Sequence, residues 1–179
     1  ADLTRANLTG ALLVHADLSG SQLGGAELTR AVYDRNTRFP HDMDPSQLQD
    51  AVEIHPQADL SRRSMSGSRL NELNLAACTM AGTNLQGADL RGSSLARCNL
   101  RGAHLAKADL TNASLRGADI RGANLRGILH QGCDMNGAIY DSTTGFSAGM
   151  DPSKLGARRH AVGPPRGFQA LSESAQPSA

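Results

Sequence analysis

Large apolar residues recur at every fifth position along most of this chain. Between positions 60 and 140 the series has seventeen members without a gap; eleven of them are leucine and one, His130, is polar. Two positions before each member stands a small residue, Ala, Ser, Thr or Cys, in fourteen of these seventeen units; the exceptions are Arg63, Leu73 and Ile128. Positions 3 to 33 follow the same rule in a different phase. Each five-residue unit therefore has two inward positions, one large and one small.

A period of five fits neither an α-helix nor the two-residue alternation of a long strand, so the chain must turn once in each unit. Two positions after the large residue, ten of sixteen sites are glycine, which tolerates the backbone angles of turns. Four such units close a square coil, and coils stack at roughly 4.8 Å. The sequence predicts an all-β solenoid, a four-sided parallel β-helix of about six coils with one long interruption. Its interior ladder is expected to contain Leu60, Leu85, Leu90, Leu95, Leu100, Leu105, Leu110, Leu115, Ile120 and Leu125.

The same pattern divides the chain into five parts. Residues 1–33 form a first repeat segment and residues 58–141 the main β-helix, and a nonrepetitive loop or insertion at 34–57 separates them. Residues 142–162 are expected to cap the carboxyl-terminal end. Residues 163–179 are rich in Pro, Gly and Ser and are expected to form a flexible tail.

The two repeat segments end in similar sequences. Each ending has a Tyr at a ladder position, then a Phe six residues later, then Asp-Pro-Ser. Tyr33 with Phe39, and Tyr140 with Phe146, are expected to leave the ladder and cover exposed leucines. Residues 34–57 can bulge from one continuous solenoid or separate two solenoids. The first segment makes fewer than two coils, which favours continuity.

Composition and charge exclude several classes. The chain has 179 residues but no Trp, two Tyr and three Phe, too few aromatic residues for an ordinary globular core. Eighteen basic and seventeen acidic residues leave a formal net charge of +1, so bulk charge does not favour nucleic acid as a partner. No apolar run is long enough to predict a transmembrane segment. Because the chain begins at Ala1 inside a repeat, a targeting signal can have been removed.

The sequence predicts no catalytic centre, cofactor or metal site, and therefore no enzyme. Cys78, Cys98 and Cys133 all stand at small inward positions and lack metal-ligand spacing, so they are interpreted as buried structural thiols. The aspartates that precede many ladder residues belong to the repeat and need no acid–base role.

Basic residues are the remaining candidates for binding. Between positions 89 and 126 there are seven basic and three acidic residues. Arg101 and Arg121 are expected to stack on successive coils. Together with Arg126 they are the candidate contacts for an acidic protein surface, and a solvated face is the competing interpretation.

Three units carry a resemblance to a known family. Residues 88–92, 118–122 and 123–127 read Ala-Asp-Leu-Arg-Gly, Ala-Asp-Ile-Arg-Gly and Ala-Asn-Leu-Arg-Gly, and they resemble consensus pentapeptide repeats. The resemblance covers about two thirds of the chain. It implies the right-handed quadrilateral β-helix of the pentapeptide-repeat family. The Tyr-Asp…Phe…Asp-Pro ending resembles that of cyanobacterial and chloroplast members, which implies a phototroph.

The expected function is that of a non-catalytic structural module for protein–protein interaction, a scaffold or adaptor, for example in a large photosynthetic assembly. One alternative that the resemblance implies is a topoisomerase-binding DNA mimic. This activity requires a strongly acidic surface. Another is a solenoid domain of a larger multidomain protein. The protein partner, the oligomeric state and the compartment, whether cytoplasm, thylakoid lumen or periplasm, stay open.

Overall fold

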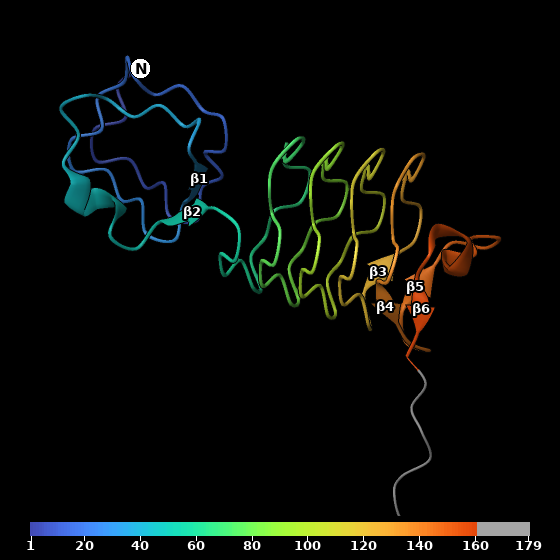
Figure 1. The fold of residues 1–179 in the computed structure, drawn as a ribbon. Helices are drawn as coiled ribbons and strands as arrows, with labels where there is room; N and C mark the ends of the chain where they lie inside the picture. The colour runs from blue at the N-terminus through green and yellow to red at the C-terminus, as the bar shows by residue number, and fades with distance from the viewer. Residues whose placement is uncertain (161–179) are drawn as a thin grey trace, which may run out of the picture.

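The computed structural model describes residues 1–160, whose backbone winds into stacked square coils (Figure 1). The regular elements are short. The strands are β1 (Val32–Asp34), β2 (Val52–Ile54), β3 (Asn124–Leu125), β4 (Ile139–Tyr140), β5 (Gly145–Phe146) and β6 (Arg158–Arg159), and the 3-10 helices are η1 (Pro45–Leu48) and η2 (Pro152–Leu155). The strands pair in parallel as β1–β2, β3–β5 and β4–β6. Within this part of the chain, no helix is both long and apolar enough to cross a membrane.

Most of the coil is held by isolated parallel β-bridges between residues twenty positions apart. These bridges recur at every fifth residue from Asp59–Thr79 to Asp119–Ile139, so four bridged sides make one turn. On each side three backbone hydrogen bonds join successive coils. For example, the N–H of Leu90 donates to the carbonyl of the residue before Leu110 at 2.8 Å. This register makes the structure a parallel, four-sided β-helix.

The interior is a column of leucines and small residues. All ten ladder residues named above are completely buried. Met65, Met80 and Met135 occupy equivalent positions and are equally buried. Full burial of a leucine contributes roughly 1.5–3 kcal/mol, and each one needs the coils before and after it to be covered. Stacking of coils is therefore what stabilises the fold.

Where an Asp or Asn precedes a ladder residue, its side chain shapes the turn that follows. Its side-chain oxygen accepts the N–H of the residue two positions later, as Asp59 does from Ser61 at 2.9 Å and Asn84 does from Gln86 at 3.1 Å. Such an Asx turn bends the chain after a short extended segment. This explains the repeated aspartates without any catalytic role.

The corner position, two residues after the ladder residue, has a positive φ. At five of the six main β-helix corners with a positive φ that are not glycine, the side chain lies against a glycine corner of the next coil; Ala77 is the exception. Arg97 has a φ of 59°, and its Cγ lies 3.6 Å from where a Cβ on Gly117 would stand. Arg62 has the same relation to Gly82, also at 3.6 Å. Glycine at one corner thus leaves room for a long side chain at the corner beneath it.

Both repeat segments end in the same capping arrangement. Tyr33 and Phe39 pack edge-to-face with ring centroids 5.5 Å apart, and Tyr140 and Phe146 do the same at 5.5 Å. After each pair the chain forms a 3-10 helix, η1 or η2, whose leucine packs against a buried cluster. The first repeat segment is therefore closed by its own cap.

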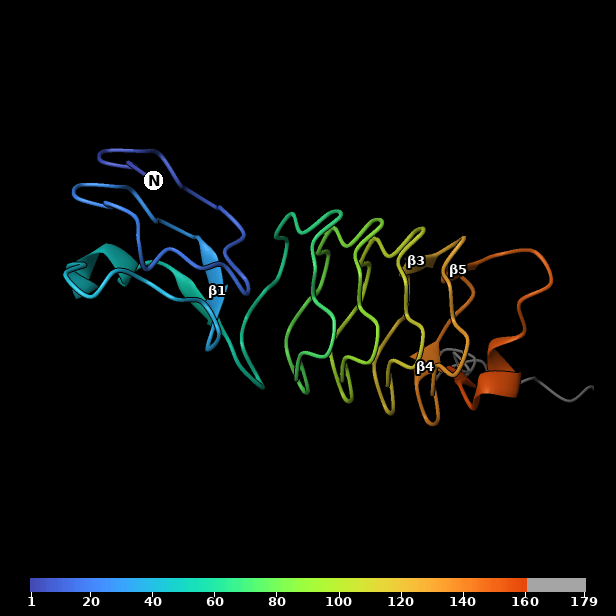
Figure 2. The same cartoon turned by 90° about the horizontal axis from the view of Figure 1, so that it is seen from above.

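The structure consists of two blocks, the amino-terminal block (residues 1–54) and the main β-helix (58–141). Leucines such as Leu13 and Leu28 belong to a buried cluster separate from that of the main β-helix. In residues 1–160, no bridge joins β2 to the first coil of the main β-helix. Figures 1 and 2 show that the axis along which the coils of the amino-terminal block stack lies across the axis of the main β-helix. The structure differs here from the continuous solenoid that the sequence favoured, because the cap ends the first stack.

Acid is expected to weaken the carboxyl-terminal cap. The hydroxyl of Thr143, together with the backbone N–H groups of Thr143 and Gly122, outweighs desolvation and lowers the pKa of Asp141 to about 2. Because this value lies below the ordinary 3.8, the ionised carboxylate stabilises the fold above about pH 4, and this contribution is lost as the pH falls towards 2. Asp141→Asn keeps an acceptor oxygen but cannot titrate. Its urea midpoint should therefore fall less than that of the parent between these two pH values.

Asp42→Asn is the matched control, because Asp42 is exposed and accepts no hydrogen bond in the described structure. It should leave the pH dependence unchanged. Equal pH dependence of the parent and Asp141→Asn would contradict this account of the cap.

The corners predict a pair of opposite effects on stability. Gly117 has a φ of 66°, so Gly117→Ala should destabilise the fold by about 1 kcal/mol because an L side chain is disfavoured there. Arg97→Gly removes the cost of an L side chain at a positive φ one coil earlier, so this variant should be as stable as the parent or slightly more stable. Urea denaturation of both variants measures the difference. A loss of stability in Arg97→Gly equal to that in Gly117→Ala would contradict the explanation.

Candidate functional site

The side of the amino-terminal block that faces the main β-helix is apolar. Outward positions elsewhere in this block carry residues such as Asp2 and Asn7, but Leu12, Val32 and Val52 occupy the outward positions of this side. Val32 is 1% exposed, and all three pack with the buried cluster of the main β-helix. The apolar side thereby shields the first coil of the main β-helix from water. Sequence reasoning missed this contact, although the three apolar outward residues were a readable signal.

Residues that break the five-residue rule lie in the terminal coils of the main β-helix. Arg63 and Leu73 stand at small-residue positions of the first coil, and Ile128 stands at one in the last. Leu73 and Ile128 are buried in the main cluster. The guanidinium of Arg63 instead reaches the amino-terminal block, where it donates to the carbonyl of Arg30 at 2.8 Å. Larger side chains fit in a terminal coil because the interior has a coil on one side only.

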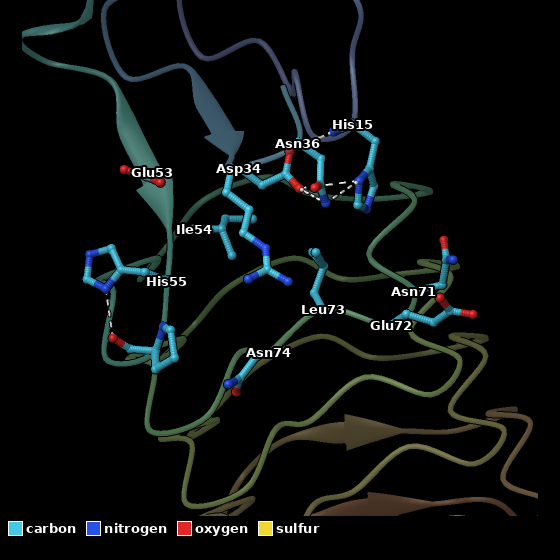
Figure 3. Close-up of a pocket in the computed structure, with 12 residues that line it drawn as sticks. His15, Asp34, Asn36, Glu53, Ile54, His55, Asn71, Glu72, Leu73 and Asn74 are labelled. Carbon is cyan, nitrogen blue, oxygen red and sulfur yellow. Dashed lines mark hydrogen bonds and ion pairs between the residues drawn. The ribbon is translucent and has the colours of Figure 1, made fainter. Parts of the chain in front are cut away.

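A cleft of about 630 Å³ opens beside this junction (Figure 3). Its walls come from three segments: Asn36 follows β1, Glu53 lies on β2, and Glu72 belongs to the first main coil. These three side chains are exposed, whereas Ile54 and Leu73 add buried apolar surface. The cleft, defined by these residues and their neighbours, combines an apolar part with a polar rim, as protein interfaces do.

One titratable pair lines the cleft and belongs to the amino-terminal cap. Nδ1 of His15 is 3.3 Å from the carboxylate of Asp34, and the backbone N–H of His15 donates to the same carboxylate at 2.8 Å. Burial raises the pKa of Asp34, but the amide of His15, the hydroxyl of Thr37 and the His15 ring outweigh burial and leave the pKa below its ordinary value. Asp34 thus tethers the end of β1 to the previous coil.

The three arginines suggested by the sequence do not form one basic patch. Arg121 donates through Nε to Asp119 at 2.8 Å, and Nη1 of Arg101 is 3.7 Å from the same carboxylate. The two guanidinium groups therefore share one counter-charge. Arg126 lies on the neighbouring side, and no carboxylate in residues 1–160 is within 4.0 Å of it. The shared carboxylate therefore offsets only part of the positive charge of Arg101 and Arg121.

The three cysteines are free and buried. Burial and then the charge of Asp134 raise the pKa of Cys133 to about 12, and the neighbouring thiol of Cys78 and burial raise that of Cys98 further. The thiol of Cys98 donates to the carbonyl of Leu75 at 2.8 Å. Both raised pKa values disfavour the reactive thiolate. The part of the chain that the structure describes contains no cluster of His, Cys, Asp or Glu suited to a metal ion.

The five-residue units match a family model described as "Pentapeptide repeats", in eight copies over residues 1–32, 57–92 and 93–129. The chain belongs to the pentapeptide-repeat family. No curated protein sequence gives a match. Proteins of the pentapeptide-repeat family are generally non-catalytic.

Several solved pentapeptide-repeat structures are similar to this chain. One from Nostoc Pcc 7120 has 31% identity and a TM-score of 0.48, covering 58% of this chain and 86% of its own. Rfr23 from the cyanobacterium Cyanothece 51142 has 23% identity and a TM-score of 0.47, covering 81% and 90%. A protein of the Arabidopsis thaliana thylakoid lumen has 28% identity and a TM-score of 0.39, covering 56% and 61%. Cyanobacterial and chloroplast pentapeptide-repeat proteins, the kind that the ending resembles, are thus among the structures similar to this chain.

A charge in the apolar junction should separate the two blocks. Val32→Asp buries a carboxylate without a partner and is expected to cost at least about 2 kcal/mol at the contact. Small-angle X-ray scattering should then show a larger radius of gyration while circular dichroism keeps its β signal. Asn7→Asp adds the same charge at an exposed outward position and should change neither measurement. An unchanged scattering profile for Val32→Asp would contradict the proposed contact.

Proposed function

We propose that this protein is a non-catalytic protein–protein interaction module, a scaffold or adaptor. The observation that supports the proposal is the junction, where exposed Glu53 and Glu72 and the apolar Ile54 and Leu73 line a single open cleft. The side chains come from both blocks, and the leucine ladder behind them makes the backbone a fixed support. Such a cleft suits a protruding polypeptide segment of a partner.

The family and the surface charges add to this proposal. We infer that the coils are right-handed, as in pentapeptide-repeat proteins, and that residues 142–160 act as a cap. Arg126 is exposed and free of carboxylates among residues 1–160, so it is the arginine best able to contact an acidic partner surface. The cyanobacterial and chloroplast relatives favour an assembly of a phototroph as the setting.

A DNA mimic of the kind that binds topoisomerases is less well supported. Such a protein must present negative charge where phosphates would lie. Between positions 58 and 141 there are ten basic and seven acidic residues. Asp89, Asp119 and Asp134 each have an arginine nitrogen within 2.9 Å. These pairs cancel the charge that mimicry would require.

The test is affinity purification of the tagged full chain from the organism that encodes it, followed by cross-linking mass spectrometry. A partner in fixed stoichiometry should cross-link to residues around the cleft. The double variant Glu53→Lys with Glu72→Gly should lose this partner. It should still fold, since Gly is compatible with the φ of 60° at position 72. Glu27→Lys changes charge at an exposed outward position away from the cleft and should retain the partner.

Two outcomes would overturn this proposal. A partner that the double variant retains would exclude the cleft as the contact. Recovery of a topoisomerase, with inhibition of supercoiling by the purified protein, would support the mimic instead.

A further inference from the structure

A second hollow, of about 360 Å³, lies at the junction and shares no lining residue with the cleft. Thr9, Gly10 and Arg30 of the amino-terminal block line one part of it, and Arg62, Arg63 and Ser64 of the first main coil line another. Three arginines, a threonine and a serine therefore line a space of small-molecule size.

The arginines are placed there by three local departures from the repeat. Arg30 and Arg62 stand at corners, with φ of 58° and 55°, where glycine is the commonest residue of the main β-helix. Arg63 stands at a small inward position and crosses the junction to the carbonyl of Arg30 at 2.8 Å. Because this bond fixes Arg63 between the blocks, the cluster exists only when the blocks are docked.

The positive charge of this cluster is not compensated by ion pairs. In residues 1–160, no carboxylate lies within 4.0 Å of Arg30, Arg62 or Arg63, whereas Arg91 and Arg121 each have one. Burial and then repulsion from Arg30 hold the pKa of Arg63 below its ordinary value, and nearby Asp59 opposes them without reversing the shift. A positive potential is therefore available for an anion.

We propose that this hollow, the three-arginine pocket, binds a phosphate group, either inorganic phosphate or the phosphate of a small phosphomonoester. Guanidinium groups form paired hydrogen bonds to phosphate oxygens, and the hydroxyls of Thr9 and Ser64 can add donors. The size of the pocket suits a phosphate with a small substituent and not a duplex. This site is independent of the cleft and of the proposed function.

Binding in the three-arginine pocket should also hold the two blocks together. Its donors come from both sides of the junction, so a bound phosphate bridges them. The melting temperature of the full chain should therefore rise with phosphate concentration, because a ligand stabilises the state that binds it.

The experiment is isothermal titration calorimetry of the full chain with inorganic phosphate and with glycerol 3-phosphate, at an ionic strength kept constant with chloride. Arg30→Gly and Arg62→Gly restore glycine at positive-φ corners, and Arg63→Ala restores a small inward residue, so all three should fold. Each should weaken binding by about tenfold or more through loss of a charged hydrogen-bond donor. Arg97→Gly removes an arginine with the same corner conformation outside the pocket and should bind like the parent.

The two ligands separate the sources of phosphate. Tighter binding of glycerol 3-phosphate indicates a phosphomonoester ligand, and tighter binding of inorganic phosphate indicates the free ion; both support the site. The proposal is overturned if neither ligand binds saturably, if Arg97→Gly weakens binding as much as Arg62→Gly does, or if only an acidic peptide binds.

Discussion

Every coil of this protein depends on a neighbouring coil whose residues are twenty positions away. The backbone hydrogen bonds of each five-residue unit point along the stack, and each ladder leucine is covered by the equivalent residue of the next coil. A single coil would leave both its leucines and its amide groups exposed to water. The interior is therefore repetitive and uniform, and the special features of the molecule arise where a coil lacks a neighbour.

The chain closes these ends in two different ways. An edge-to-face aromatic pair and a 3-10 helix close the carboxyl-terminal end of each block, with Tyr33 and Phe39 in one and Tyr140 and Phe146 in the other. The amino-terminal end of the main β-helix is instead covered by the side of the other block. This lateral contact brings together side chains that the period of five never places side by side, and both the cleft and the three-arginine pocket result from it.

Local repetition explains how much could be predicted from the sequence. The buried ladder, from Leu60 to Leu125, and the glycine corners follow from a five-residue pattern, because each unit makes the same contacts as the next. The relative orientation of the two blocks does not follow from the five-residue pattern. It depends on apolar outward residues such as Val32, and each coil has only one outward position on that side. The stacking of Arg101 above Arg121 could be predicted, but the sharing of Asp119 between them depends on side-chain geometry.

The same periodicity limits where a specific partner can bind. A partner that shifts along one side of the main β-helix by a single coil meets nearly the same backbone and a similar set of Asx turns, so the side alone defines its position poorly. Arg63, Leu73 and Glu53 break the pattern and occur at one place only. Residues that break the repeat therefore make the junction and the caps the parts of the molecule best suited to recognition of a single position along the stack.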